Sequence, residues 1–429
     1  MCPHCRFLGI VKVIAERAKN LTVSAVRDQA IMCLGNIVVD CDTCRKHVMK
    51  TTIFETILDL LQTPTNFNAI QRDHYAWTLQ NIIRPSPTSP DLNVLLTEME
   101  REKMLKIAIG LITLPPPDVS IIQGVELFHD WIMIDEEKSV GVSIVENETV
   151  MNHLLQIFNG NDDDCSSKVI RSIGNLVCYD DDVIQRIIDY GFVSSMDTRR
   201  LTAGVGLESN IIWCLSNILG SFQSSYVHEI YDRTELLEYL IRSCYSYEIY
   251  IRRESIFCVK NICSFFQGEE QKKLYQTFFG KMIVDILDGF TIEKDVAMAQ
   301  AVQGILTHCI DEMKKNNPIY KEMIYENGFE EAVQRRCEWT QITLETFDVG
   351  NPQRIELLRL LNVCDYAVKS IHDYKNVSKC DSQMEKMKSD ALAPMDTTPS
   401  RPPRKDSCAQ RSVANLDDEL LNVLPDTTK

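Results

Sequence analysis

A short pattern built around asparagine recurs along this chain and constrains its fold more than any other feature. Each copy holds an aliphatic residue, one variable residue, the asparagine and a second aliphatic residue. Degenerate copies occur around Asp130 and Thr307, and the seven equivalent positions lie 42 to 49 residues apart. One unit of about 45 residues is therefore repeated along the chain. The five regular copies are Leu34-Gly35-Asn36-Ile37, Leu79-Gln80-Asn81-Ile82, Ile173-Gly174-Asn175-Leu176, Leu215-Ser216-Asn217-Ile218 and Val259-Lys260-Asn261-Ile262.

The residues within each unit carry helical signals. In the segment 183–191, apolar residues recur at helical spacing, and Gly191 stands where the C-terminal cap of a helix belongs. Strand alternation is nowhere sustained. Helical repeats of about 40 to 47 residues are typical of armadillo and HEAT arrays, in which each two- or three-helix unit packs on its neighbours. We therefore predict an all-α solenoid of the armadillo or HEAT type over residues 1–375.

The repeat pattern stops near residue 376. A chain of 429 residues exceeds what one hydrophobic core usually organises, and stacked repeats explain that length. Residues 376–429 contain five prolines and no aromatic residue, so they bury too little apolar area to offset the entropy of ordering. We predict a disordered tail over 376–429. Its amphipathic segment 416–424 either docks as a helix or remains a solvated end with helical bias.

Charge and composition exclude several classes of protein. The net charge is −16, and residues 1–375 carry −15 of it, which disfavours nucleic acid and favours basic partners. No apolar run is long enough to span a bilayer, so we expect no membrane insertion. No nucleophile with a base, no carboxylate pair in a cleft and no phosphate loop can be placed. We therefore predict neither an enzyme nor a cofactor.

The 16 cysteines indicate a reducing compartment, the cytoplasm and nucleus. Two CxxC pairs, Cys2/Cys5 and Cys41/Cys44, are separated by 35 residues, more than the usual zinc-site spacing of about 15 to 20. We therefore predict no metal site. Other cysteines fall in apolar helical patterns and are expected to be reduced core thiols, as at Cys33, Cys214 and Cys258.

An aromatic residue precedes several of the recurring asparagines by four positions, as in Trp77/Asn81, Trp213/Asn217 and Phe257/Asn261. Four residues make about one helical turn, so both side chains share a face. If equivalent helices stack in parallel, the carboxamides can bond to the backbone of an extended peptide, and the aromatic rings can hold the stem of a lysine or arginine. Alternatively, each asparagine serves the hydrogen bonding of the solenoid itself.

Longer segments around these copies carry a more specific resemblance. They resemble, in order, parts of importin alpha, the adaptor that carries nuclear localisation signals, over about residues 25 to 365 and the second to tenth armadillo repeats of that family. The resemblance implies a right-handed armadillo-repeat solenoid over residues 1–375, with about eight to nine repeats and an incomplete first one. It also implies a concave groove that binds the basic signal peptides of nuclear cargo proteins. The segments are Arg27-Asp28-Gln29-Ala30 through Asp40, 75–84, 171–177, 212–218, 252–257 and 325–331.

The main groove of the family uses tryptophans in the second, third and fourth repeats. Those places are Met32, Trp77 and Glu126 here, and Asp130 replaces the asparagine of the fourth repeat. A single tryptophan cannot form a slot, so we expect this groove to be degraded. The residues that remain in the family pattern are Asn36, Asp40, Trp77 and Asn81.

The smaller groove of the family is better preserved, with phenylalanine in place of one tryptophan at 257. From the resemblance we expect an import adaptor that binds a basic peptide here. The alternatives are an armadillo scaffold that has lost cargo transport and binds other protein partners, or a truncated gene model of an import adaptor. Family members also carry an N-terminal basic segment that binds importin beta. The sequence begins inside what would be the first repeat, so binding of importin beta and of the recycling exportin is left open. The matching residues are Arg171, Asn175, Trp213, Asn217, Glu254, Phe257 and Asn261.

Overall fold

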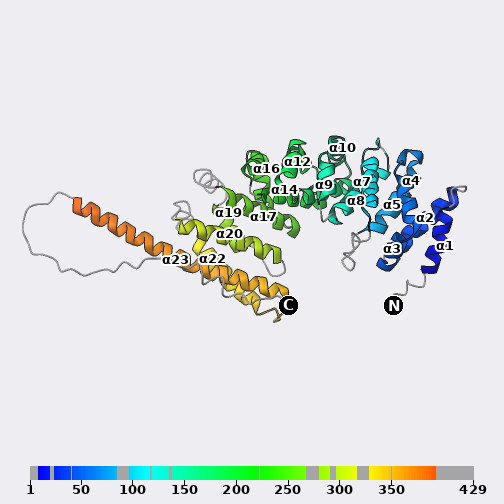
Figure 1. Cartoon of the computed structure of the whole chain (residues 1–429). Helices are drawn as coiled ribbons and strands as arrows, with labels where there is room; N and C mark the ends of the chain where they lie inside the picture. Colours follow the sequence, from blue (N-terminus) through cyan, green and yellow to red (C-terminus); the bar gives the residue numbers. More distant parts are fainter. Residues whose placement is uncertain are drawn as a thin grey trace, which may run out of the picture. The chain divides into compact units, whose positions relative to one another are not determined.

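The computed structural model describes residues 8–19, 24–39, 41–84, 96–115, 118–134, 138–221, 223–266, 280–289, 296–315, 328–348 and 350–392. Every regular element within these ranges is a helix (Figure 1), which confirms the predicted all-α class. The helices are α1 Leu8–Ala18, α2 Ser24–Val38, α3 Asp42–Met49, α4 Thr52–Leu61, the 3-10 helix η2 Pro64–Asn66, α5 Ala69–Ile83, α7 Glu98–Ile112, α8 Ser120–Ile134, α9 Ser139–Val145, α10 Glu148–Phe158, α11 Asp163–Leu176, α12 Asp181–Asp189, α13 Phe192–Arg199, α14 Val205–Leu219, α15 Ser224–Tyr231, α16 Thr234–Ser243, α17 Ile249–Phe265, α19 Gly280–Gly289, α20 Val296–Lys314, α22 Phe329–Leu344 and α23 Pro352–Leu392.

The helices form repeats in which the third helix is the longest. The series α12, α13 and α14 has 9, 8 and 15 residues, and the series α15, α16 and α17 has 8, 10 and 17. The third helices α2, α5, α8, α11, α14, α17 and α20 each pack on the next in that order. This stacking of three-helix units confirms the predicted armadillo-repeat solenoid.

Local sequence signals set several helix boundaries. Asn68 caps α5, because its Oδ1 accepts a hydrogen bond from the backbone N–H of Gln71. In return, the backbone N–H of Asn68 donates to Gln71 Oε1. Gly191 joins α12 to α13 with a φ of 87°, a left-handed conformation that only glycine adopts without strain. The helix end predicted at Gly191 is therefore correct, and Gly328 makes the same left-handed turn before α22 with a φ of 72°.

The buried aliphatic residues of neighbouring repeats form one continuous core. Cys214 and Cys258 lie in it without solvent exposure, as predicted, but Cys33 is exposed. Each residue of a helix turns about 100° from the previous one, so Cys33 faces outward while Leu34 faces inward. Of the two CxxC pairs, Cys41 caps α3 by accepting a hydrogen bond on Sγ from the backbone N–H of Cys44. Cys2 and Cys5 lie outside the described residues.

The chain divides into two compact units, Met1–Lys375 and Asn376–Lys429. The predicted loss of regular structure at 376 does not hold for residues 376–392, because α23 continues to Leu392. This polar stretch contains neither proline nor glycine, so its backbone retains the intrinsic capacity to form a helix. The amphipathic segment 416–424 lies outside the described residues. Within the described ranges, no helix has both the length and the apolarity needed to cross a membrane.

Two glycines allow third helices to approach closely beneath a tryptophan. Trp77 on α5 lies against Gly35 of α2, and Trp213 on α14 lies against Gly174 of α11. A Cβ atom at Gly35 would come within 2.5 Å of the Trp77 ring, and one at Gly174 would collide with the Trp213 ring. Each glycine directly precedes a recurring asparagine, so the same short motif supplies both the amide and the surface for the indole.

Replacing Gly174 with alanine is expected to destabilise the solenoid by about 1–3 kcal/mol, because the added methyl group overpacks the Trp213 site. The measurement is the urea midpoint of helical circular dichroism. Gly206→Ala in α14 is the matched control, since a Cβ there meets no atom within 4 Å and should be neutral or slightly stabilising. Equal midpoints for the wild type and Gly174→Ala would contradict this packing.

Candidate functional site

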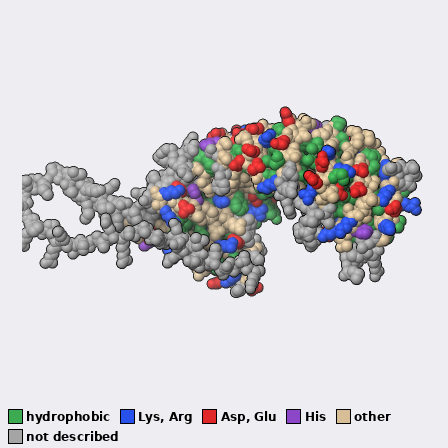
Figure 2. All heavy atoms as spheres, in the orientation of Figure 1, with side chains coloured by type: hydrophobic (Ala, Val, Ile, Leu, Met, Phe, Trp, Pro, Cys, Tyr) green, Lys and Arg blue, Asp and Glu red, His purple; other side chains and the backbone are tan. Residues whose placement is uncertain are grey.

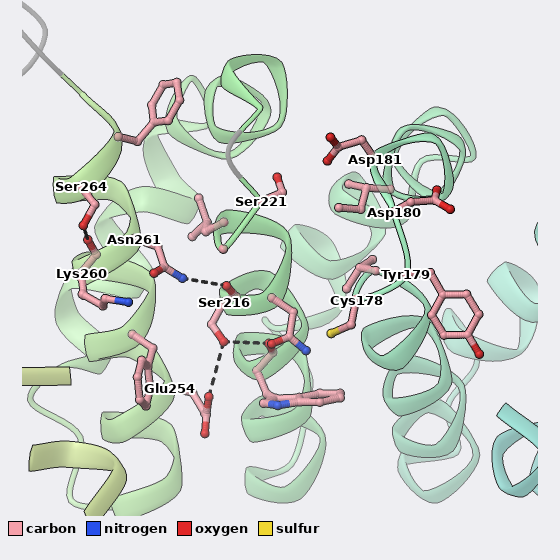
Figure 3. Close-up of a pocket in the computed structure, with 18 of the residues that line it drawn as sticks. Cys178, Tyr179, Asp180, Asp181, Ser216, Ser221, Glu254, Lys260, Asn261 and Ser264 are labelled. Atoms are coloured by element: carbon pink, nitrogen blue, oxygen red, sulfur yellow. Dashed lines mark hydrogen bonds between the residues drawn. The ribbon is translucent and has the colours of Figure 1, made fainter. Parts of the chain in front are cut away.

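A cleft of about 1040 Å³ lies along the C-terminal half of α14, between α17 and the segment that joins α11 to α12 (Figure 3). Five of the predicted site residues line it: Trp213, Asn217, Glu254, Phe257 and Asn261. They come from two consecutive third helices, where the four-residue spacing places each aromatic ring one turn before its asparagine. Arg171 and Asn175 belong to the neighbouring α11 and are outside the cleft lining.

The asparagines of the cleft form a ladder between third helices. Asn217 Nδ2 donates to the carbonyl oxygen of Gly174 at 3.0 Å, and Asn261 Nδ2 donates to that of Ser216 at 3.0 Å. Each acceptor directly precedes the asparagine of the previous helix. The amide groups therefore form hydrogen bonds between helices of the solenoid, as the alternative interpretation of these asparagines predicted. Among the described residues neither Oδ1 accepts a hydrogen bond, so both oxygens remain available as acceptors.

Glu254 is buried and already bound by residues of the chain. Its Oε1 accepts bonds from Arg253, at 2.9 Å from Nε and 2.8 Å from Nη2, and Ser216 Oγ donates to Oε2 at 3.4 Å. The guanidinium of Arg253 also lies over the Tyr250 ring, 5.2 Å from its centroid. A ligand cation would therefore meet a carboxylate that is largely neutralised by this arginine.

The two sides of the cleft carry opposite charge. Asp180 and Asp181 border it at the start of α12, while Lys260 borders it from α17 (Figure 3). Asp180 caps α12 through the Val183 N–H, and Asp181 accepts a bond from Gln223. Figure 2 shows further Asp and Glu side chains over the region of α12 and α16. Sequence reasoning missed these three groups, although Lys260 occupies the variable place directly before Asn261.

The residues predicted for the degraded groove do not present one common surface. Asn36 is exposed, and its Nδ2 donates to the carbonyl oxygen of Met32 in its own helix at 3.1 Å. Asn81 is buried, and its Nδ2 finds no hydrogen-bond partner in the part of the chain that the structure describes. Trp77 is half-buried over Gly35. Asp40 lies outside the described residues.

On α8, Glu126 and Asp130 stand where the cleft helices have an aromatic residue and an asparagine, and both are bound by other side chains of the protein. Asp130, which cannot donate as asparagine does, instead accepts a bond from Gln80 Nε2 at 2.7 Å, so this rung of the ladder is reversed. Burial raises the pKa of Asp130, opposed by this bond and by Arg84. Glu126, four residues before Asp130, forms an ion pair with Lys168 of α11. This stretch therefore stacks normally without forming an aromatic slot.

His129 lies between α8 and α11, where Ser172 Oγ approaches its Nδ1 at 3.3 Å. Burial and the nearby charge of Arg171 lower the pKa of His129 to about 4. The Asn175 amide on the same helix is turned toward α8, where its Nδ2 lies 3.2 Å from Sδ of Met133. Asn175 thus contacts α8, and neither Arg171 nor Asn175 lines the cleft.

No protein-family model and no curated protein matches the sequence. One engineered protein of known structure aligns over 83% of this chain and 98% of its own, at 14% identity and a TM-score of 0.52. A second engineered protein aligns over 59% of this chain and 98% of its own, at 16% identity and a TM-score of 0.50. These two likenesses concern the fold alone. A designed armadillo repeat protein in complex with the peptide (KR)4 aligns over 59% and 99%, at 12% identity. With its TM-score of 0.48, this likeness carries no argument about the fold or the function of the chain.

The half-buried imidazole of His129 is expected to make stability depend on pH. Its pKa is lower in the folded protein, about 4, than the 6.5 of an exposed histidine, so folding favours the neutral ring. The resulting stability is complete above pH 6.5 and is lost as the pH falls toward 4. Between pH 7 and 4.5 the wild type should lose about 2 kcal/mol more stability than His129→Gln in urea unfolding. Parallel losses in the two proteins would contradict a half-buried neutral His129.

Proposed function

We propose that this protein binds a short, extended, basic peptide in the cleft between α14 and α17, as an importin-alpha-like adaptor for nuclear localisation signals. The observation that carries the proposal is the convergence of Trp213, Phe257, Asn217 and Asn261 on one cleft from two consecutive third helices. Aromatic rings with polar groups beside them suit a side chain that has an apolar stem and a charged head.

In this proposal the stem of a lysine or arginine lies between the Trp213 and Phe257 rings. The Trp213 indole is a rigid wall, because its ring rests on Gly174 and cannot sink further toward α11. The charged head gains cation–π attraction from the rings and faces Asp180 and Asp181 at the border of the cleft. The free oxygens of Asn217 and Asn261 accept hydrogen bonds from the peptide backbone.

The charge of the protein supports a basic ligand. Residues 1–375 carry −15, which attracts cationic peptides from a distance and accelerates their encounter with the cleft. The stretch from α5 to α11 contributes this general attraction only, since Lys168 pairs with Glu126 there. We therefore propose one peptide site rather than two.

The import role is tested separately from peptide binding. In the proposed role, the full chain used as bait in a cytoplasmic and nuclear extract retains lysine-rich nuclear proteins, with or without importin beta. A scaffold that has lost transport would retain another stable partner and no such cargo. Recovery of that kind would remove the import role and leave the cleft as a peptide site.

Trp213→Ala is expected to weaken binding of a fluorescein-labelled Lys-Arg peptide at least tenfold, a loss of about 1.4 kcal/mol, because one wall of the slot disappears. Fluorescence anisotropy measures the affinity. Trp77→Ala is the matched control: it also removes an indole that lies on a glycine, but outside the cleft, and should leave affinity unchanged. Equal affinities for the wild type and Trp213→Ala, or equal losses in both variants, would reject the site.

A further inference from the structure

Lys260 is a cation in the cleft that no other described residue compensates. It is half-buried on α17, directly before Asn261, and it borders the cleft opposite Asp180 and Asp181 (Figure 3). Among the described residues its ammonium group has neither a hydrogen-bond nor an ion-pair partner. Arg253, the other base of the lining, is paired with Glu254. A ligand anion forms a strong charge-assisted hydrogen bond with a half-buried ammonium that lacks a counter-charge.

The neighbouring helix holds the stem of Lys260 in place. A Cβ atom at Gly304 of α20 would come within 2.8 Å of Lys260 Cε and 3.2 Å of its Cδ and Cγ, so the stem lies across this glycine. On α14, Trp213 contacts the residue of the previous third helix that directly precedes its asparagine, namely Gly174. On α20, the residue in the same relation to α17 is Gly304, which contacts Lys260 directly before Asn261. Gly304 therefore occupies the place of the aromatic residue in the next repeat, so the structure puts His308, not Thr307 as the sequence pattern indicated, at the place of the asparagine. Its missing side chain leaves the room that the lysine stem fills.

Beyond Lys260 the surface changes from charged to largely neutral and polar. Lys260 and Ser264 also line a second hollow of about 460 Å³, together with Gln300, Gln303 and Thr307 of α20. His308 of this hollow is mostly neutral at pH 7, because burial lowers its pKa. The carboxylate of Asp311 is partly offset by Lys314 at 4.0 Å. The amides and hydroxyls beside the Lys260 ammonium are suited to a carboxylate side chain, whereas Asp311 disfavours one at its own end of the hollow.

We propose that the cleft recognises a peptide in which a basic residue is followed or preceded at a fixed distance by an acidic one, Asp or Glu, that pairs with Lys260. This inference rests on the proposed function and specifies its ligand. The basic residue enters the slot of Trp213 and Phe257, and the acidic residue lies on the α20 side. Opposite charges at the two ends fix the direction of the peptide, which a uniformly basic ligand would not do.

The test is a positional scan with labelled peptides that share one Lys-Arg pair. A single Glu, Gln or Lys is placed at each of the four positions on either side of the pair, and affinities are measured by anisotropy. With the wild type, Glu should bind about three- to tenfold more tightly than Gln at one position, and Lys more weakly than Gln. With Lys260→Met the preference for Glu over Gln should vanish. With Lys260→Glu the order should reverse, so that Lys binds best.

Lys106→Glu on α7 is the matched control, because it changes the net charge equally at an exposed residue away from the cleft and should keep the preference for Glu. If the wild type binds the peptides but no position distinguishes Glu from Gln, the role of Lys260 is wrong while the proposed function stands. The same conclusion follows if Lys260→Glu keeps the order of the wild type. If the wild type binds none of the peptides, the proposed function fails as well.

Discussion

The stacking of third helices is the constraint on which the rest of this structure depends. Each such helix must satisfy polar groups while it approaches its predecessor closely enough to bury a shared core. Around Gly174 both needs are met at one residue, because its carbonyl oxygen accepts the bond from Asn217 and its missing side chain admits the Trp213 ring. The geometry of the cleft is thus fixed by contacts that also hold the solenoid together, so the cleft exists before any ligand arrives.

The same constraint explains how part of the molecule can keep the fold without forming an aromatic slot. On α8, Asp130 accepts a bond from Gln80, so the contact with α5 persists although the direction of the hydrogen bond is reversed. Glu126 is satisfied by Lys168 in the same way. Stacking requires only that each polar group finds a partner, whereas a slot for a lysine stem requires two aromatic walls. Substitutions of this kind therefore remove the slot at little cost to the solenoid.

The period of the asparagine pattern was sufficient to predict the helical repeats, since helix spacing is a local property of the chain. It also placed Trp213, Asn217, Phe257 and Asn261 on one face. The features that the sequence did not reveal depend on side-chain contacts, either between repeats or within one helix. Lys260 occupies a variable position, and its role follows only from Gly304 on the next helix. The pairing of Glu254 with Arg253 depends on side-chain direction, which no spacing rule supplies.

Long-range and local charge have different consequences in this protein. The net charge of −15 on residues 1–375 acts on any cationic peptide and is screened beyond about 8 Å at physiological salt, so it favours encounter without setting a register. Inside the cleft the balance is different, because Arg253 already neutralises Glu254. Selectivity must then come from the shape of the slot and from the charges at its two borders, which form no ion pair with any described residue. An acidic molecule can in this way present a cationic contact, and Lys260 is the side chain placed to do so.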